Sequence, residues 1–311
     1  MLGGILRQHI VEFIPGTGMV TDGVINATSL SGPWTWVSPN GVARGLISGC
    51  GAGGGGAGGY GIGTALAGGG GGGGGVCCIG FPAFWYPGAS LTITAGAPGP
   101  GGAVGAGAAN GGATTCAGLA TNIPGSRTIF PTPGTMMLAG GGSPNFGGTA
   151  TGGGPGGGGY ELGFGCDPSG AGGTNGAAPT DGLLSSEVFY QVFGAQFYER
   201  TGMGGGGACT TVTTPGATGG GWRSNGGEIL NSSMTYANGS AGFSSGTISY
   251  GGGGDGAPSY FGAPGIGGGG AANAAGTAAT GFGSGGGGGG GGGVGGNGAP
   301  GYLRIEYWSA D

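Results

Sequence analysis

Histidine, glutamate and cysteine are the side chains of this sequence that could most readily take part in catalysis or metal binding, and the sequence contains few of them. The only imidazole, His9, lies three residues before Glu12, a spacing that could imitate a proton-transfer pair. The surrounding residues have a strand-like pattern, which favours a structural role. The six cysteines stand at positions 50, 77, 78, 116, 166 and 209. None shows the C-x₂-C spacing of a zinc site, so the pattern favours burial as small apolar residues, with a disulfide framework as the alternative.

The remaining carboxylates and the glycine-rich loops form no catalytic constellation. Asp167, Asp181 and Asp255 lie in glycine-rich turns that could hold Ca²⁺, but no regular Asp-x-Asp pattern accompanies them. The many GxGxxG matches lack the strand–helix context and the later acidic residue of a nucleotide site. We therefore predict a protein that is not an enzyme, with no catalytic residue, no cofactor and no metal.

Aromatic side chains that interrupt the glycine are the candidates for binding. Tyrosine and tryptophan offer large, stiff contact surfaces on which sugar rings can stack. The candidate receptor contacts are Phe189, Tyr190, Phe193, Phe197, Tyr198, Trp222, Tyr236, Tyr250, Tyr260 and Phe261. The alternative is that these rings fill a thin core between the glycine tracts. Trp34, Trp36 and Trp308 lie in strand patterns, and we expect all three in the core.

Composition excludes several classes of partner. Charged residues make up only 5% of the chain and the net charge is −5. The basic residues are all arginines and are scattered, so they cannot form the basic stripe that nucleic acid requires. Arg7, His9 and Glu12 interrupt the apolar start of the chain, unlike a signal peptide, and no run approaches the roughly 20 apolar residues of a membrane span. We therefore expect synthesis in a cytoplasm without an export signal.

Short strands are predicted wherever apolar and polar residues alternate. Trp34, Trp36 and Ser38 share one face of a segment whose other face carries Thr35 and Val37. Further strands are expected within 1–33, 42–51, 84–96, 126–142 and 298–308.

The last of these segments, 298–308, should close the domain. Its apolar residues Leu303, Ile305 and Tyr307 face one way, and the charged residues Arg304 and Glu306 face the other. The pattern is typical of a half-buried strand.

One segment, 181–203, has few glycines and many aromatic residues. Ser185 or Ser186 could cap a helix there, and a hairpin turning at Gly194-Ala195 fits the same residues equally well.

Glycine supplies 100 of the 311 residues, including nine in succession at 285–293. A flexible linker is the simplest interpretation, but these tracts lack the serine and charge of most linkers and lie between strands. We predict packed polyglycine II helices, in which each tract hydrogen-bonds to its neighbours and the 285–293 tract leads back into the closing strand. The expected fold class is therefore all-β with extensive irregular structure: a short-stranded β-sandwich combined with packed polyglycine II helices.

The order of these elements resembles the glycine-rich domains of tailed-bacteriophage tail and tail-fibre proteins. "WTWVSPNGVARGLISGCGAGGGGAGG" resembles their opening strand pair, "YPGASLTITAGAPGPGGAVGAGAANGGATT" their second signature, and "GNGAPGYLRIEYW" their closing strand. The match covers about 34–308. The chain is also similar to the adhesins that tip some long tail fibres, which are known for polyglycine II bundles whose connecting loops meet the bacterial surface. It departs from them in its strong strand segments and in lacking an obvious cleavage or chaperone region.

The resemblance implies a virion component of the tail that is made in the host cytoplasm. Residues 1–33 would form an attachment or oligomerisation segment that contacts other tail proteins, and 34–311 a glycine-rich β/polyglycine domain with an aromatic-rich insertion at about 181–203. The implied function is host recognition and adsorption without enzymatic activity, through aromatic loops that bind a host surface glycan or outer-membrane component. A homo-oligomer, either a trimer or a cap on a trimeric fibre, would fit. A purely structural decoration or tail subunit is the alternative.

Overall fold

The structure is a computed structural model that describes most of the first 120 residues and the last 60. The described residues are 6–27, 29–62, 65–120, 134–138, 140–144, 252–257, 259–269 and 273–310, with short strands at 182–183, 198–200, 222–223, 243–245 and 248–250. Over these residues the protein is all-β and has no helix. Nearly all of the 181–203 segment lies outside them, so the choice between helix and hairpin there stays open.

The larger sheet has seven strands, all antiparallel, in the order β13-β8-β5-β19-β1-β2-β3. These strands are β1 (Leu6–Ile14), β2 (Gly18–Thr21), β3 (Val24–Ala27), β5 (Arg44–Cys50), β8 (Cys77–Phe84), β13 (Tyr198–Arg200) and β19 (Tyr302–Ala310). Asp22 and Gly23 both have positive φ and form the tight turn between β2 and β3 that an Asp-Gly pair favours. The first strand, β1, pairs along its length with the closing strand β19, so the N-terminal strands belong to the same sheet as the rest of the domain.

A second antiparallel sheet has four strands in the order β11-β10-β9-β4. Its strands are β4 (Trp34–Val37), β9 (Ser90–Thr94), β10 (Thr114–Ala117) and β11 (Thr135–Leu138). A single buried cluster contains side chains of both sheets, including Phe13, Ile47 and Ile305 of the larger and Trp36 and Ile93 of the smaller. The two sheets therefore share one hydrophobic core.

The alternating faces predicted for the strands are confirmed, with one exception. Trp34 and Trp36 are buried on β4, and Leu303, Ile305 and Tyr307 are buried on β19. The prediction that Trp308 lies in the core is wrong. Its side chain is 39% exposed, because it shares the outward face of β19 with the charged side chains of that strand.

Three smaller sheets complete the described strands. Four strands form the first, in the order β15-β16-β7-β6, and the other two are the pairs β12-β14 and β17-β18. Their members are β6 (Tyr60–Ile62), β7 (Ala65–Ala67), β12 (Gly182–Leu183), β14 (Trp222–Arg223), β15 (Phe243–Ser245), β16 (Ile248–Tyr250), β17 (Gly262–Ala263) and β18 (Thr280–Gly281).

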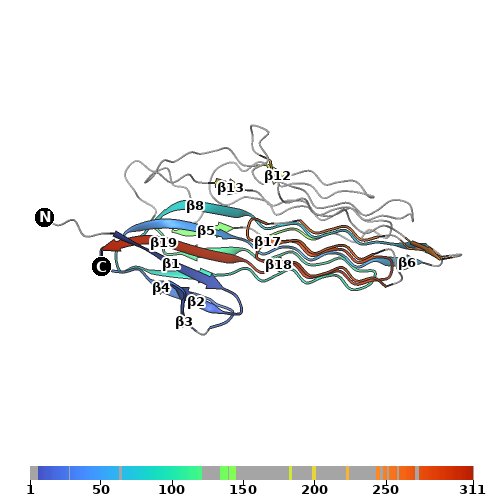
Figure 1. The fold of residues 1–311 in the computed structure, drawn as a ribbon, viewed down its shortest axis with the longest axis horizontal. Coiled ribbons are helices and arrows are strands. Elements are labelled where there is room, and N and C mark those ends of the chain that lie inside the picture. Colours follow the sequence, from blue (N-terminus) through green and yellow to red (C-terminus); the bar gives the residue numbers. More distant parts are fainter. Residues whose placement is uncertain are drawn as a thin grey trace.

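Extended glycine-rich tracts, several of which continue strands of the two large sheets, run to the opposite end of the molecule, where β6 lies (Figure 1). The tracts are 51–59, 68–76, 95–103, 106–113, 140–144, 252–257, 264–269, 274–279, 284–290 and 293–301. The 51–59 tract leaves the end of β5, and the 68–76 tract returns into β8. An outward and a returning tract thus join β5 to β8, and the tracts 95–103 and 106–113 join β9 to β10 in the same way.

Hydrogen bonds between tracts follow a period of three residues. From the 51–59 tract, Gly53, Gly56 and Gly59 all donate to carbonyls of the 293–301 tract. The residues that follow Gly53 and Gly56 donate to the 68–76 tract, and the residues that precede Gly53, Gly56 and Gly59 donate to the 106–113 tract. Successive backbone N–H groups therefore point in three directions, and each direction is served by one neighbouring tract.

The glycine tract 284–290 lies at the centre of this array. Every N–H of residues 285–290 donates to another tract, and every C=O of residues 284–290 accepts from one, with N–O distances of 2.7–3.1 Å. Its partners are the tracts 51–59, 68–76, 252–257, 264–269, 274–279 and 293–301. The predicted hydrogen bonding of this tract is confirmed, with one refinement: the chain turns at Gly291 and Gly292, and it is the following tract that returns into β19.

Close approach of the backbones explains why the central tract is nearly pure glycine. A Cβ added to Gly287 would overlap the carbonyl oxygen of Ile266 in the neighbouring tract, and a Cβ on Gly288 would overlap the carbonyl oxygen of Gly69. Backbone atoms cannot move aside as the end of a flexible side chain can. The peripheral tract 95–103 is different: Gly96, Gly99 and Gly102 are buried, whereas most residues between them carry side chains directed to solvent.

We expect Gly287→Ala to destabilise the protein strongly, by about 3 kcal/mol or more, because the methyl group forces two tracts apart and breaks their hydrogen bonds. Denaturation monitored by circular dichroism measures this. The matched control is Ala275→Gly on the exposed face of the peripheral tract 274–279, which should cost only about 0.5–1 kcal/mol. Equal effects of the two substitutions would contradict the close packing of the central tract.

Amide hydrogen exchange should rank the tracts by their position in the array. We expect the amides of 285–290 to be among the slowest in the protein, since each is bonded to a neighbouring tract and buried on all sides. Amides of the exposed tract 274–279 should exchange much faster. Rapid exchange throughout 285–290 would show instead that this segment behaves as a flexible linker.

Candidate functional site

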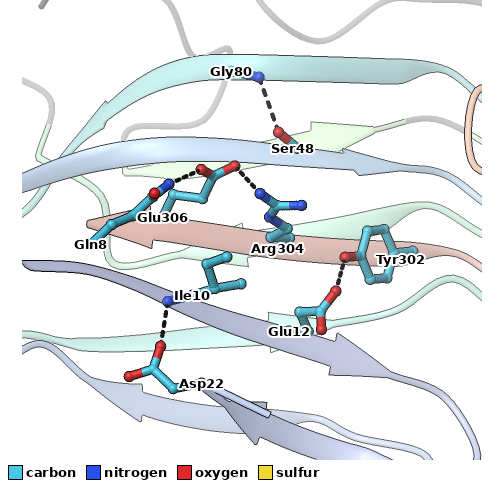
Figure 2. A network of polar contacts seen from close by, with 9 residues as sticks. All are labelled: Gln8, Ile10, Glu12, Asp22, Ser48, Gly80, Tyr302, Arg304 and Glu306. Atoms are coloured by element: carbon cyan, nitrogen blue, oxygen red, sulfur yellow. Dashed lines mark hydrogen bonds and ion pairs between the residues drawn. The ribbon is translucent and has the colours of Figure 1, made fainter. Parts of the chain in front are cut away.

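His9 and Glu12 do not form a proton-transfer pair, because alternation along β1 places their side chains on opposite faces of the sheet. His9 Nδ1 lies 2.8 Å from Asp22 Oδ2, and its ring stacks on Tyr307 with centroids 5.0 Å apart. Glu12 instead accepts a hydrogen bond of 2.5 Å from the hydroxyl of Tyr302 (Figure 2). Both residues connect neighbouring strands.

Asp22 is held in its ionised form by these contacts. The Ile10 N–H donates to Asp22 Oδ1 at 2.8 Å, and this bond, together with His9, lowers the pKa of the Asp22 carboxyl below its ordinary value of 3.8. The carboxylate bridges β1 to the turn after β2, which is a structural arrangement.

The outward face of the larger sheet carries several polar contacts among side chains and backbone groups. Gln8 donates to Glu306 at 2.7 Å, and Arg304 forms an ion pair of 2.7 Å with the other oxygen of the same carboxylate (Figure 2). Ser48 accepts a hydrogen bond from the Gly80 N–H on the neighbouring strand. Gln8 and Ser48 thus connect adjacent strands, whereas the ion pair of Arg304 with Glu306 lies within β19.

The four described cysteines, Cys50, Cys77, Cys78 and Cys116, are all buried. Burial raises the pKa of Cys116 to about 12, so this thiol stays protonated at neutral pH. Burial as small apolar residues, the interpretation favoured from sequence, describes these four, and Cys166 and Cys209 lie outside the described residues.

No group of three His, Cys, Asp or Glu side chains that could hold a metal ion occurs in the part of the chain that the structure describes. Of the three aspartates considered for Ca²⁺, Asp167 and Asp181 lie outside that part.

The third aspartate, Asp255, lies within the tract 252–257 and is 2% exposed. Its Oδ1 accepts a hydrogen bond of 2.7 Å from the Gly267 N–H of the adjacent tract. Loss of solvent raises the pKa of this carboxyl from its ordinary 3.8 to about 6, although the hydrogen bond acts in the opposite direction.

The aromatic residues proposed as receptor contacts are only partly described. Phe189, Tyr190, Phe193, Phe197 and Tyr236 lie outside the described residues, and Tyr198, Trp222 and Tyr250 are described only as positions in β13, β14 and β16. Tyr260 and Phe261 lie together in a turn, with ring centroids 5.1 Å apart. Tyr260 is 43% exposed, whereas Phe261 packs against Tyr302 where the sheets meet the tracts.

The far end of the array, where tracts reverse direction, brings together residues that sequence reasoning did not select. Gly59 hydrogen-bonds to Gly105 and to Gly293, so the turns after the 95–103 and 284–290 tracts meet beside β6. Val104 and Val294 are exposed at these turns. Val104 interrupts the glycine-rich sequence and could have marked its reversal, whereas the reversal at Gly291 and Gly292 lies inside the run of nine glycines and has no such signal.

A small sheet lies at the same end and is rich in aromatic positions. Phe243 of β15 is opposite Tyr250 of β16, and Tyr250 pairs with Leu66 of β7. Tyr60 begins β6, where the 51–59 tract ends. The far end thus consists of tract turns and this four-stranded sheet, and it is the candidate binding surface.

Comparison with known proteins gives no further guidance, because no protein-family model and no curated protein matches the chain. Among the described residues there is no helix of the length and apolar character needed to cross a membrane.

The buried carboxyl of Asp255 should make stability depend on pH. Its pKa is higher in the folded protein than in the unfolded chain, so the folded state binds more protons between about pH 4 and 6. The free energy of unfolding should therefore fall as pH rises through this window, and Asp255→Asn should remove that part of the slope and stabilise the protein at pH 7.

Asp22→Asn provides a control of opposite sign. The pKa of Asp22 is lowered by folding, so its contribution to stability is present above pH 4 and is lost as the pH falls below its ordinary pKa. Denaturation curves between pH 3 and pH 8 test both substitutions. An unchanged slope between pH 4 and 6 in Asp255→Asn would contradict the assignment.

Proposed function

We propose that the tracts are polyglycine II helices and that the two large sheets form a β-sandwich from which these helices extend. The period of three in the hydrogen bonds supports this, because such a helix has three residues per turn and no internal hydrogen bonds. The six tracts around 284–290 correspond to the packing of parallel rods, each surrounded by six others. The shared core of the two sheets supports the sandwich.

On this architecture, the protein is a tail-fibre or tail-tip component of a tailed bacteriophage, and it contributes to host recognition without catalysing a reaction. One observation carries the proposal: a stiff array of tracts separates a strand-rich end from an end made of turns. Such an array can hold binding loops away from an anchoring domain. The resemblance of the strand–polyglycine–strand order to phage tail proteins points the same way.

The far end would contact the host, and the strand-rich end would contact other tail proteins. The far end offers apolar and aromatic positions set among small residues, a composition suited to a surface glycan or an outer-membrane component. At the other end, the edge strand β3 exposes Val24 and Ile25, which suits attachment of the N-terminal segment to a neighbouring subunit, as in a trimer or a cap on a trimeric fibre.

Imaging distinguishes this function from a purely structural one. Gold-labelled antibodies against the chain would be applied to purified phage particles whose genome encodes the chain. We expect label at the distal end of the tail or its fibres. Label along the tail or on the capsid would favour a decoration or structural subunit, and particles without label would contradict a role in the virion.

Substitution at the far end tests the surface itself. We expect the double variant Val104→Asp/Val294→Asp to reduce adsorption to host cells at least tenfold, because the added charges oppose burial of this surface. The matched control is Val37→Asp, since Val37 is similarly exposed but lies on β4 at the strand-rich end. If only the Val37→Asp control lost adsorption, the host contact would lie at the strand-rich end, which would contradict the proposal.

A further inference from the structure

Two buried thiols face each other where the larger sheet passes into the glycine array. Cys50 is the last residue of β5 and Cys77 is the first residue of β8, and the two are directly opposite in the antiparallel register. The chain between them contains the tracts 51–59 and 68–76 with the strands β6 and β7. A bond between these residues would close that whole segment into a loop.

The hydrogen bonding defines the geometry of this pair. The Gly51 N–H donates to the Val76 carbonyl at 2.9 Å, so Gly51 and Val76 form a hydrogen-bonded pair. Pairs alternate along an antiparallel ladder, and Cys50 and Cys77 are consequently a non-hydrogen-bonded pair, whose Cα atoms are typically about 4.5 Å apart. Disulfides span Cα separations of about 4.4–6.8 Å, so the separation typical of such a pair lies within the range that a disulfide can bridge.

The side chains of the pair lie on the same face and in one small cluster. Cys50 and Cys77 are buried together with Ala257 and Tyr302. Burial raises the pKa of Cys50 well above its ordinary value, and a contact with the Cys77 thiol raises it further. The two sulfur atoms are thus neighbours in an apolar environment.

The adjacent Cys78 is excluded as a partner by the alternation of β8. Its sulfur is directed to the Ile47 carbonyl at 3.8 Å and belongs to the main core between the two large sheets. Cys77 is instead directed to the Gly75 carbonyl at 3.6 Å, at the start of the array. Only one of the two neighbouring cysteines therefore faces Cys50.

We propose that Cys50 and Cys77 are a cross-strand disulfide site, oxidised by a small-molecule disulfide such as oxidised glutathione. One cysteine thiolate attacks the reagent, forming a mixed disulfide and releasing one thiol. The second cysteine then displaces the remaining thiol and forms the Cys50–Cys77 bond. Two cysteine thiols lose two protons and two electrons, and one disulfide reagent becomes two thiols.

Because both thiols are buried in the folded protein, we expect oxidation to occur during folding and to be slow afterwards. The test therefore refolds the full chain in oxidised and reduced glutathione, digests it with pepsin at low pH to suppress exchange, and identifies linked peptides by mass spectrometry. We expect a peptide pair that joins Cys50 to Cys77 and is lighter by two hydrogen atoms than the reduced pair. The linked protein should denature at higher temperature than its reduced form.

Matched variants make the result specific. Cys50→Ser and Cys77→Ser should each abolish the link, whereas Cys78→Ser and Cys116→Ser should retain it, because these residues lie in the main core. Circular dichroism confirms that each variant has folded. A natively folded wild-type protein without the Cys50–Cys77 link, or with Cys50 joined to Cys78 instead, would overturn the proposal.

Discussion

The structure depends on backbone hydrogen bonds between glycine tracts that, at most positions, lie too close together for a side chain. Glycine loses more conformational freedom on folding than any other residue, and a chain with so many of them needs a large compensating term. In the 284–290 tract the compensating contribution is a full set of backbone hydrogen bonds, since the N–H and C=O groups are bonded to surrounding tracts. A buried backbone group left unpaired would cost about 1–3 kcal/mol, so the array tolerates few defects.

The two large sheets provide what the tracts lack, namely a register. A row of glycines presents the same surface at every step of its repeat, and nothing within it specifies which carbonyl a given N–H should meet. The strands are different, because Leu91 and Ile305, among others, fit one position in a shared core. Since the tracts 95–103 and 293–301 continue β9 and β19 without interruption, the register set by side chains in the core passes into the array.

This division also explains what the sequence could predict. The faces of β4, β9 and β19 follow from the alternation of apolar and polar side chains along each strand. Trp308 was misplaced because the same alternation puts it on the outward face of β19. The hydrogen-bond partner of a tract glycine cannot be predicted in this way, because Gly56 bonds to Gly296 and no property of either residue selects the other. A weaker signal does exist, because glycine at every third position over 96–105 marks a tract with one face buried and the others in solvent.

The same rule limits the size of the array. A tract that is glycine on all sides can accept neighbours in every direction, so an array with glycine on its surface could add tracts from other molecules, as an exposed strand edge adds strands. The peripheral tracts prevent this. Pro98 and Pro100 are exposed and have no N–H to offer, and Ala103 and Ile266 place side chains where another backbone would have to approach. The faces of the array that carry these residues are therefore closed to further tracts.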